Sequence, residues 1–260
     1  MKSIGNCALV AALWAACVFA APAHAGAECR FESPQHRVAL LELYTSEGCS
    51  SCPPADQWFS RLRAQGIDAD SAVLLAFHVD YWNELGWPDP YSQPAFTARQ
   101  RGAAPRASRG IVYTPQLLLD GLDYRPGAPL RQPLSAIKRQ PPGARIRASV
   151  QRDAAEVHVR GEVDNLTGGS PAQVWMAVYE NGLFTHVRAG ENAGKRLNHD
   201  FVVRDLVGPV ALTAGSSARL DHRLKVGADA QSERLGVAIF VERPQTGNVV
   251  QAATLYPLCS

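Results

Sequence analysis

The 260-residue sequence lacks the features that mark several common classes of protein. Its formal net charge is only +2, so no basic excess favours nucleic-acid binding. No segment after residue 26 is apolar enough to span a bilayer, and neither an internal repeat nor a low-complexity tract is present. Methionine is scarce, with two in the chain and none beside a cysteine. What remains is the composition of an ordinary globular protein.

The N-terminus carries an export pattern. Lys2 precedes an apolar run from roughly Ala8 to Ala21, and Ala23-His24-Ala25 fits a small-x-small cleavage site. We therefore expect a signal peptide over residues 1–25 and a periplasmic or secreted mature protein without stable membrane insertion. A membrane anchor is the alternative, but the run is shorter than the ~20 residues that a spanning helix needs.

Export would reduce the cysteine count from six to four. The cysteines that remain are Cys29, Cys49, Cys52 and Cys259. Four cysteines allow three pairings in an oxidising compartment. Cys49 with Cys52 would close a very small loop, and by elimination Cys29 would pair with Cys259, near the other end of the mature chain. We expect the long-range pair to be structural. The local pair is a redox disulfide, half of a metal site or a structural staple.

A Pro/Gly segment at residues 140–144 separates two regions with different sequence patterns. Residues 26–140 alternate short apolar runs with helix-like segments, and residues 141–260 contain short alternating strands separated by polar turns. The expected fold class is an α/β domain over 26–140 with a helical insertion at about 80–112. An all-β, sandwich-like domain then follows over 141–260.

The first domain sets the Cys-x-x-Cys pair between a strand and a helix. Apolar runs predict strands at 38–44, 71–79 and 115–121, and helices are expected at 53–65 and 128–139. Unpaired N–H groups and the helix dipole would favour a thiolate at Cys49, with Cys52 one turn inside the helix to resolve a mixed disulfide. Cys49 is therefore expected to be the exposed nucleophile and Cys52 the buried thiol. Ser50 and Ser51 can donate further hydrogen bonds to the thiolate.

Three stretches carry a resemblance to a known family: LELYTSEGCSSCPPAD, AFHVDYWNELGWPDPYSQPAFTARQR and YTPQLLLDG. They resemble a bacterial family of secreted thioredoxin-like proteins that is named only as a domain of unknown function. The resemblance covers roughly residues 38–121 and extends loosely through 190–206. It implies a thioredoxin-like fold, and thiol–disulfide exchange by analogy, since a fold does not fix a function.

The resemblance also assigns Thr114 and Pro115 to the site, because thioredoxins carry a cis-proline at this place. An ordinary strand-starting proline is the alternative reading. Gly48 and the Ser-Ser dipeptide depart from the best-known thioredoxins, so the same substrates are not implied. Exported protein thiols or disulfides, together with a redox partner protein, are the expected partners.

The segment after the second strand adds auxiliary candidates. His78 lies at the end of the second predicted strand, and Asp80, Tyr81 and Trp82 follow it; this end of the strand lies on the same sheet edge as the cysteine loop. His78 can orient or protonate a leaving thiol, or it is a satisfied core residue. The aromatic residues line a groove beside Cys49, or they simply pack the insertion.

Two other functions compete with a redox enzyme that needs no cofactor beyond its disulfide. Cys49, Cys52 and His78 form a soft ligand set that suits copper, as in thioredoxin-like copper chaperones. The cysteine spacing there is one residue longer, which argues against copper. A non-catalytic binding module, with the all-β domain binding a partner, is the third possibility.

Overall fold

The computed structural model describes residues 27–259, and β-strand is its main secondary structure. Strand accounts for 42% of the structure and helix for 16%. The predicted signal peptide lies outside the described residues. Within residues 27–259, no helix is long and apolar enough to cross a membrane.

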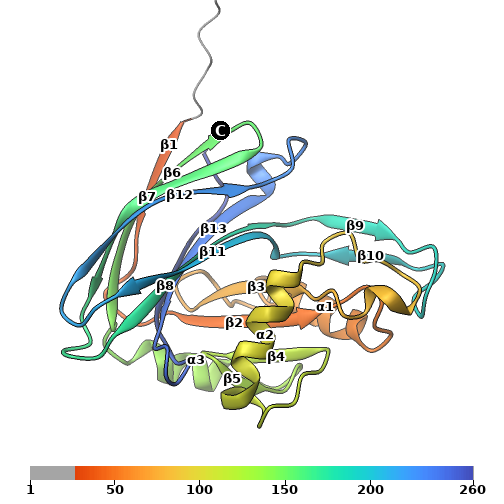
Figure 1. Cartoon of the computed structure of the whole chain (residues 1–260), viewed down its shortest axis with the longest axis horizontal. Coiled ribbons are helices and arrows are strands. Elements are labelled where there is room, and N and C mark those ends of the chain that lie inside the picture. The colour runs from red at the N-terminus through yellow and green to blue at the C-terminus, as the bar shows by residue number, and fades with distance from the viewer. Residues whose placement is uncertain (1–26, 260) are drawn as a thin grey trace, which may run out of the picture.

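One eight-stranded sheet runs through the molecule (Figure 1). Its strands, in spatial order, are β14 (Val249–Leu255), β13 (Leu235–Glu242), β8 (Ala172–Glu180), β11 (Val202–Leu212), β3 (Ala72–His78), β2 (Ala39–Thr45), β4 (Gln116–Leu119) and β5 (Leu122–Tyr124). β3 pairs in parallel with both β2 and β11, and the other neighbours are antiparallel. Every residue of β2 and β3 is buried, as expected for central strands covered on both faces.

A four-stranded sheet packs over one end of the large sheet. It consists of β1 (Glu28–Glu32), β6 (Ala144–Asp153), β7 (Glu156–Asn165) and β12 (Ser217–Lys225). Buried and half-buried positions alternate over residues 144–151 of β6, and the buried side chains share one core with those of β8, β13 and β14. A hairpin of β9 (Leu183–His186) and β10 (Arg196–His199) extends towards α1 on the right of Figure 1.

Helices cover both faces of the β2–β3 region. They are α1 (Cys52–Ser60), α2 (Pro94–Ala107) and α3 (Arg131–Lys138), with single 3-10 turns at η1 (Asn83–Leu85) and η2 (Ser232–Arg234). Leu43 of β2 lies beside α1, whereas its neighbour Glu42 contacts Arg99 of α2. Because successive strand residues point to opposite faces, α1 and α2 lie on opposite sides of the sheet.

The expected fold class, an α/β thioredoxin-like domain with a helical insertion followed by an all-β domain, is wrong. β11 lies beyond residue 140 in the sequence, yet it inserts beside β3, with Val202 opposite Ala76 and the Ala76 N–H donating to the Phe201 carbonyl at 2.8 Å. The segment at 80–112 contains η1 and α2, and α2 packs directly on the sheet through Phe96 against Phe77. Strand pairing between distant segments therefore decided the architecture, and local patterns do not encode it.

Several local predictions are confirmed. Strands occur where apolar runs predicted them at 38–44 and 71–79, and the run at 115–121 forms β4 and the turn into β5. Asp120 and Gly121 form that turn with positive φ angles of 50° and 82°. The helices expected at 53–65 and 128–139 are shorter than predicted, since α1 ends at Ser60 and α3 begins at Arg131.

Candidate functional site

Cys49 and Cys52 form a disulfide between β2 and α1. Cys52 is the first residue of α1, and its N–H donates to the Cys49 carbonyl at 3.2 Å. The Ser51 hydroxyl lies 3.2 Å from the Cys49 sulfur, and Ser50 and Ser51 are both exposed. The expectation of an exposed Cys49 is wrong, because both cysteines are fully buried.

The loop between β9 and β10, residues 187–195, holds the cysteine loop in place. The Asn192 side chain is buried and donates to the carbonyls of Glu47 at 2.8 Å and Cys49 at 2.9 Å. The Ser50 N–H donates to the Glu191 carboxylate at 2.9 Å. Hydrogen bonds from a distant part of the chain thus fix the backbone around the first cysteine.

Trp82 joins the cysteine loop to the Thr114-Pro115 segment. A Cβ at Gly48 would lie 3.1 Å from the Cβ of Trp82, and the indole N–H donates to the Thr114 hydroxyl at 2.8 Å. The Thr114-Pro115 peptide bond is cis. These contacts bring residues from three separated segments of the sequence together at one edge of the sheet.

Asp80 and Tyr81 point to other partners. The Asp80 carboxylate accepts a hydrogen bond from the Thr97 hydroxyl at 2.5 Å, which ties it to α2. Tyr81 is partly buried and packs against the core, and burial raises the pKa of its hydroxyl. Neither side chain has a contact with the cysteines among the interactions of the described residues.

His78 belongs to a buried network that also contains Glu47, Asp56, Asp89 and His199. His78 Nδ1 lies 2.6 Å from Asp89 Oδ2, and His199 Nε2 lies 2.9 Å from Glu47 Oε1. The two imidazole rings are 4.9 Å apart at 83°. The Glu47 N–H also donates to Asp89 Oδ2 at 2.8 Å, so the two histidine–carboxylate contacts form one connected unit.

Two members of the network belong to the same chain segment as the disulfide. Glu47 precedes Cys49 by two positions, and Asp56 follows Cys52 by four on the same face of α1. Asp56, His78 and His199 line a small internal cavity of about 10 Å³, the space of a single water-sized sphere. Acid–base side chains are therefore buried on the chain segments that flank both cysteines.

The surroundings of the network favour an ion pair between His78 and Asp89 and oppose the ionisation of Asp56. Burial opposes a charged imidazole, but the Asp89 carboxylate outweighs it and raises the pKa of His78. Burial likewise opposes ionisation of Asp89, and His78 outweighs it and lowers the pKa of that carboxyl. For Asp56 burial prevails and raises its pKa.

Sequence reasoning found His78 and missed its partners. Glu47 and Asp56 flank the cysteines within the stretch LELYTSEGCSSCPPAD. Two acidic residues between a buried strand and a helix were the sequence signal that could have identified them. Asp89 lies within the aromatic segment, and His199 is the last residue of β10, 121 positions from His78, so only the folded chain brings them together.

The described residues offer no set of ligands that supports copper binding. Among residues 27–259, no group of three or more His, Cys, Asp and Glu side chains is arranged to hold a metal ion. His78 Nδ1 faces Asp89 while its Nε2 has no hydrogen-bond partner in this part of the chain, and the two cysteines are bonded to each other.

The other expected disulfide is present as well. Cys29 of β1 is bonded to Cys259, so the two ends of the described chain are joined. The Cys259 N–H also points at the Cys29 sulfur, at 2.8 Å. This bond lies at the four-stranded sheet and not at the buried network.

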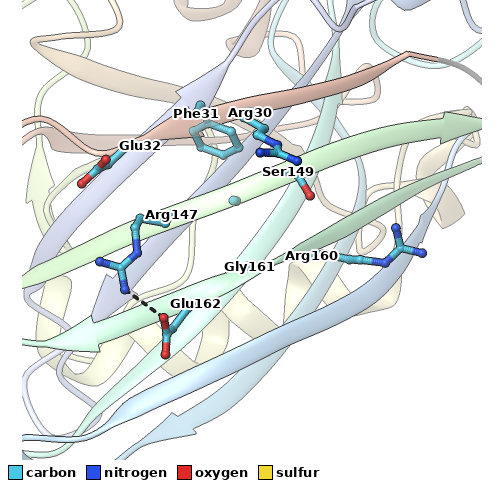
Figure 2. Close-up of a pocket in the computed structure, with 9 residues that line it drawn as sticks. Arg30, Phe31, Glu32, Arg147, Ser149, Arg160, Gly161 and Glu162 are labelled. Atoms are coloured by element: carbon cyan, nitrogen blue, oxygen red, sulfur yellow. Dashed lines mark hydrogen bonds and ion pairs between the residues drawn. The ribbon is translucent and has the colours of Figure 1, made fainter.

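A larger hollow of about 660 Å³ lies on the four-stranded sheet, at the other end of the molecule from α1 (Figures 1 and 2). Figure 2 shows Arg147 extending to Glu162, with 2.8 Å between them. Both side chains are about half exposed, so water and salt weaken the pair. The hollow is an open surface of mixed charge and presents no catalytic constellation.

Comparison with known proteins shows relatives over most of the chain. The family model described as "Protein of unknown function (DUF1223)" matches residues 40–242. A crystal structure of a protein from Agrobacterium tumefaciens is 30% identical, covers 86% of this chain and 96% of its own, and has a TM-score of 0.60. HBP35 of Porphyromonas gingivalis shares the fold at 15% identity, with a TM-score of 0.66 over 87% of this chain and 76% of its own. No curated protein matches significantly. With its family model covering more than half of its length, the chain belongs to the DUF1223 family.

Proposed function

We propose that the protein carries out thiol–disulfide exchange through Cys49 and Cys52, with exported protein thiols or disulfides as substrates. The observation that carries this proposal is the placement of the disulfide at the start of α1, between Glu47 and Asp56, which belong to a buried network of five acid–base side chains. A structural staple needs no such neighbours. Two disulfides in one chain also support an oxidising location, the periplasm or the exterior of the cell.

The start of α1 supports a thiolate at Cys49 after reduction. α1 has no acidic residue in its own first turn, and the carboxylate near its start, Glu191, is bonded to the Ser50 N–H that precedes the helix. The Ser51 hydroxyl is already 3.2 Å from the sulfur and can donate to it. These groups favour the charge that develops when the disulfide opens.

The reaction balances without a further cofactor. A substrate thiolate attacks the Cys49 sulfur, an S–S bond to the substrate forms, and the Cys49–Cys52 bond breaks with its electron pair on Cys52. Cys52 then takes a proton. A second substrate thiolate attacks the mixed disulfide at the substrate sulfur and releases Cys49 as a thiolate. The substrate has lost two electrons to the cysteine pair, and the reverse sequence reduces a substrate disulfide.

Burial of both sulfurs requires that the site opens before exchange. The Asn192 and Glu191 contacts to the cysteine loop are hydrogen bonds on a polar loop, most of whose residues are exposed. Such a loop detaches at a lower free-energy cost than a segment anchored by buried apolar side chains. The substrate's access therefore depends on displacement of residues 187–195.

Single-cysteine variants test the proposal. With reduced protein and an excess of a disulfide-bonded peptide, Cys52→Ser should accumulate a mixed disulfide on Cys49, because the resolving thiol is gone. Cys49→Ser should form none and should lose exchange activity. If the bond is only structural, both variants will lose stability equally, and mass spectrometry will detect no adduct in either.

A further inference from the structure

Charge is unevenly distributed along the chain, although the total is close to neutral. Between Asp89 and Asp153 the sequence contains eleven lysines and arginines and two acidic residues, a formal charge of +9. The remainder of the chain carries −7, since the whole has +2. Charge that is segregated in this way indicates a surface that binds a partner of the opposite sign.

Part of this basic segment forms a surface of unpaired arginines. Five of them are exposed, have no ion pair within residues 27–259 and lie on α2, β5 and α3 or directly after these elements. Together they are named the basic edge, and they are Arg101, Arg106, Arg109, Arg125 and Arg131. Two other cations of the segment are engaged, because Arg99 is buried between Glu42 and Glu242, and Lys138 pairs with Asp70.

Carboxylates offset only part of the charge of the basic edge. Asp120 is buried and pairs with Arg37 at 2.6 Å, whereas Asp123 is exposed in β5. Arg106 shares a groove with the two glutamates that bind Arg99, so one of their two charges counts against Arg106. After Asp123 and that glutamate are subtracted, the five arginines still leave an excess of three positive charges.

The basic edge surrounds β5, the outermost strand of the eight-stranded sheet. α2 covers one face of the sheet, and α3 lies on the other face with α1, because α1 and α3 line one groove. The Tyr113 hydroxyl donates to the Asp123 carboxylate at 2.8 Å, and the Tyr124 hydroxyl donates to the Pro129 carbonyl at 2.8 Å. These bonds tie β5 to the segments after α2 and before α3, which Figure 1 shows together at the lower end of the molecule.

Apolar side chains are exposed among these arginines. Ile111, Tyr113 and Leu122 are three of the seven large apolar side chains that are exposed within residues 27–259. Ile111 and Tyr113 follow Arg109 in the loop after α2, and Leu122 is the first residue of β5. Exposed apolar side chains between cations are typical of surfaces that insert shallowly between lipid headgroups.

We propose that the basic edge binds the surface of an anionic phospholipid membrane, with Ile111, Tyr113 and Leu122 between the headgroups. Guanidinium groups bind phosphate through paired hydrogen bonds. The arginines come from separate elements on both faces of the sheet, and lipid phosphates, which are mobile in the membrane, adjust to such spacing. A protein partner would instead need carboxylates fixed at matching positions. This attachment goes beyond thiol exchange and does not depend on it.

Sedimentation of the protein with phosphatidylglycerol vesicles tests the lipid class, with phosphatidylcholine vesicles as the zwitterionic match. At about 0.1 M salt we expect binding to the anionic vesicles to be at least about tenfold tighter, and to weaken at higher salt because salt screens the arginines. No binding to either vesicle, or equal binding to both, would overturn the proposal. The arginines would then serve only to protect the β5 edge from pairing with other molecules.

Two matched double variants locate the binding. Each arginine near anionic headgroups strengthens binding about fivefold, so Arg125→Ala with Arg131→Ala should lower vesicle affinity at least about tenfold. Arg160→Ala with Arg219→Ala removes the same charge from exposed positions of the four-stranded sheet and should retain the affinity. Equal loss in both variants would show that net charge alone attracts the vesicles and would refute the site.

A soluble acidic polymer separates a lipid surface from an acidic protein partner. Ile111→Ser with Leu122→Ser should weaken vesicle binding at least about threefold, because the two side chains no longer bury apolar area among the headgroups, and should leave the binding of poly(glutamate) unchanged. Vesicle binding that these substitutions do not change, together with equally tight binding of poly(glutamate), would assign the basic edge to an acidic protein and overturn the lipid.

Discussion

The Asn192 side chain donates a hydrogen bond to the backbone carbonyl of Cys49 at 2.9 Å, across 143 positions of sequence. The same nitrogen also donates to the Glu47 carbonyl at 2.8 Å. One amide therefore couples the position of the β9–β10 loop to the accessibility of the disulfide. This relationship gives the proposed exchange reaction a specific barrier that mutation can lower.

Asn192→Ala should speed reduction of the Cys49–Cys52 bond. The change leaves two carbonyls without their donor, and each such loss costs about 1–3 kcal/mol in the closed state. We expect reduction by dithiothreitol to accelerate about tenfold or more, followed by thiol labelling and mass spectrometry. Asn198→Ala, at an exposed position of β10, is the control and should react at the wild-type rate. Equal rates in all three proteins would show that Asn192 does not limit access.

Removal of the Cys29–Cys259 bond should destabilise the whole protein. The bond joins residues 230 positions apart, so it restricts the unfolded chain strongly, and the chain-entropy model gives about 5 kcal/mol. The double variant Cys29→Ala, Cys259→Ala should show this loss in urea unfolding, with Cys49–Cys52 kept oxidised. A loss below about 1 kcal/mol would mean that the bond adds little to the native state.

Asp89→Asn should change both stability and its dependence on pH. The raised pKa of His78 stabilises the fold below about pH 6.5, and this contribution is lost as pH rises through the folded-state value. The lowered pKa of Asp89 stabilises the fold above about pH 3.8, and this contribution is lost as pH falls through its folded-state value. The pair therefore contributes most between these two limits.

Urea unfolding from pH 4 to 9 measures that contribution. Between pH 4 and 6.5, we expect Asp89→Asn to cost about 3–5 kcal/mol, the usual loss when one partner of a buried pair is removed. The difference from the wild type should narrow towards high pH. The exposed Asp229→Asn serves as control and should follow the wild-type curve. A difference that stays constant across the range would assign Asp89 a packing role alone.

Two glycine substitutions should have opposite effects on stability. A Cβ at Gly161 would lie 2.3 Å from the Arg147 carbonyl oxygen, a backbone atom of the paired strand, so Gly161→Ala should cost about 1–3 kcal/mol. Gly102 is inside α2 with open space around it, so Gly102→Ala should stabilise by about 0.5–1 kcal/mol. Thermal unfolding of the two variants checks both signs, and the same sign for both would contradict the argument.

Local chemistry predicted the elements around the cysteines better than the architecture. The apolar runs at 38–44 and 71–79 are central strands, and the proline pair after Cys52 begins a helix, because these signals depend on near neighbours. The pairing of Val202 with Ala76 joins segments 126 positions apart, and strand neighbours at that distance leave no local pattern.

The candidate site was likewise predicted from the sequence only in part. His78 was identified from its place at the end of a buried strand, but its partners Asp89 and His199 are brought to it only by the folded chain. The burial of Cys49 was missed for the same reason, since Asn192 reaches it from the β9–β10 loop. A helix-start motif predicts which thiol is activated and carries no information about what covers it.

The insertion of β11 beside β3 has a consequence for any shortened form of the protein. A fragment that ends at residue 140 loses β11, so the Ala76 N–H loses its acceptor, the Phe201 carbonyl, and this edge of β3 is left open on a strand whose side chains are all apolar except His78. Open edges of this kind recruit strands from other molecules. Such a fragment should aggregate, so proteolytic release of the N-terminal half would inactivate the cysteine pair by precipitation and not by chemistry.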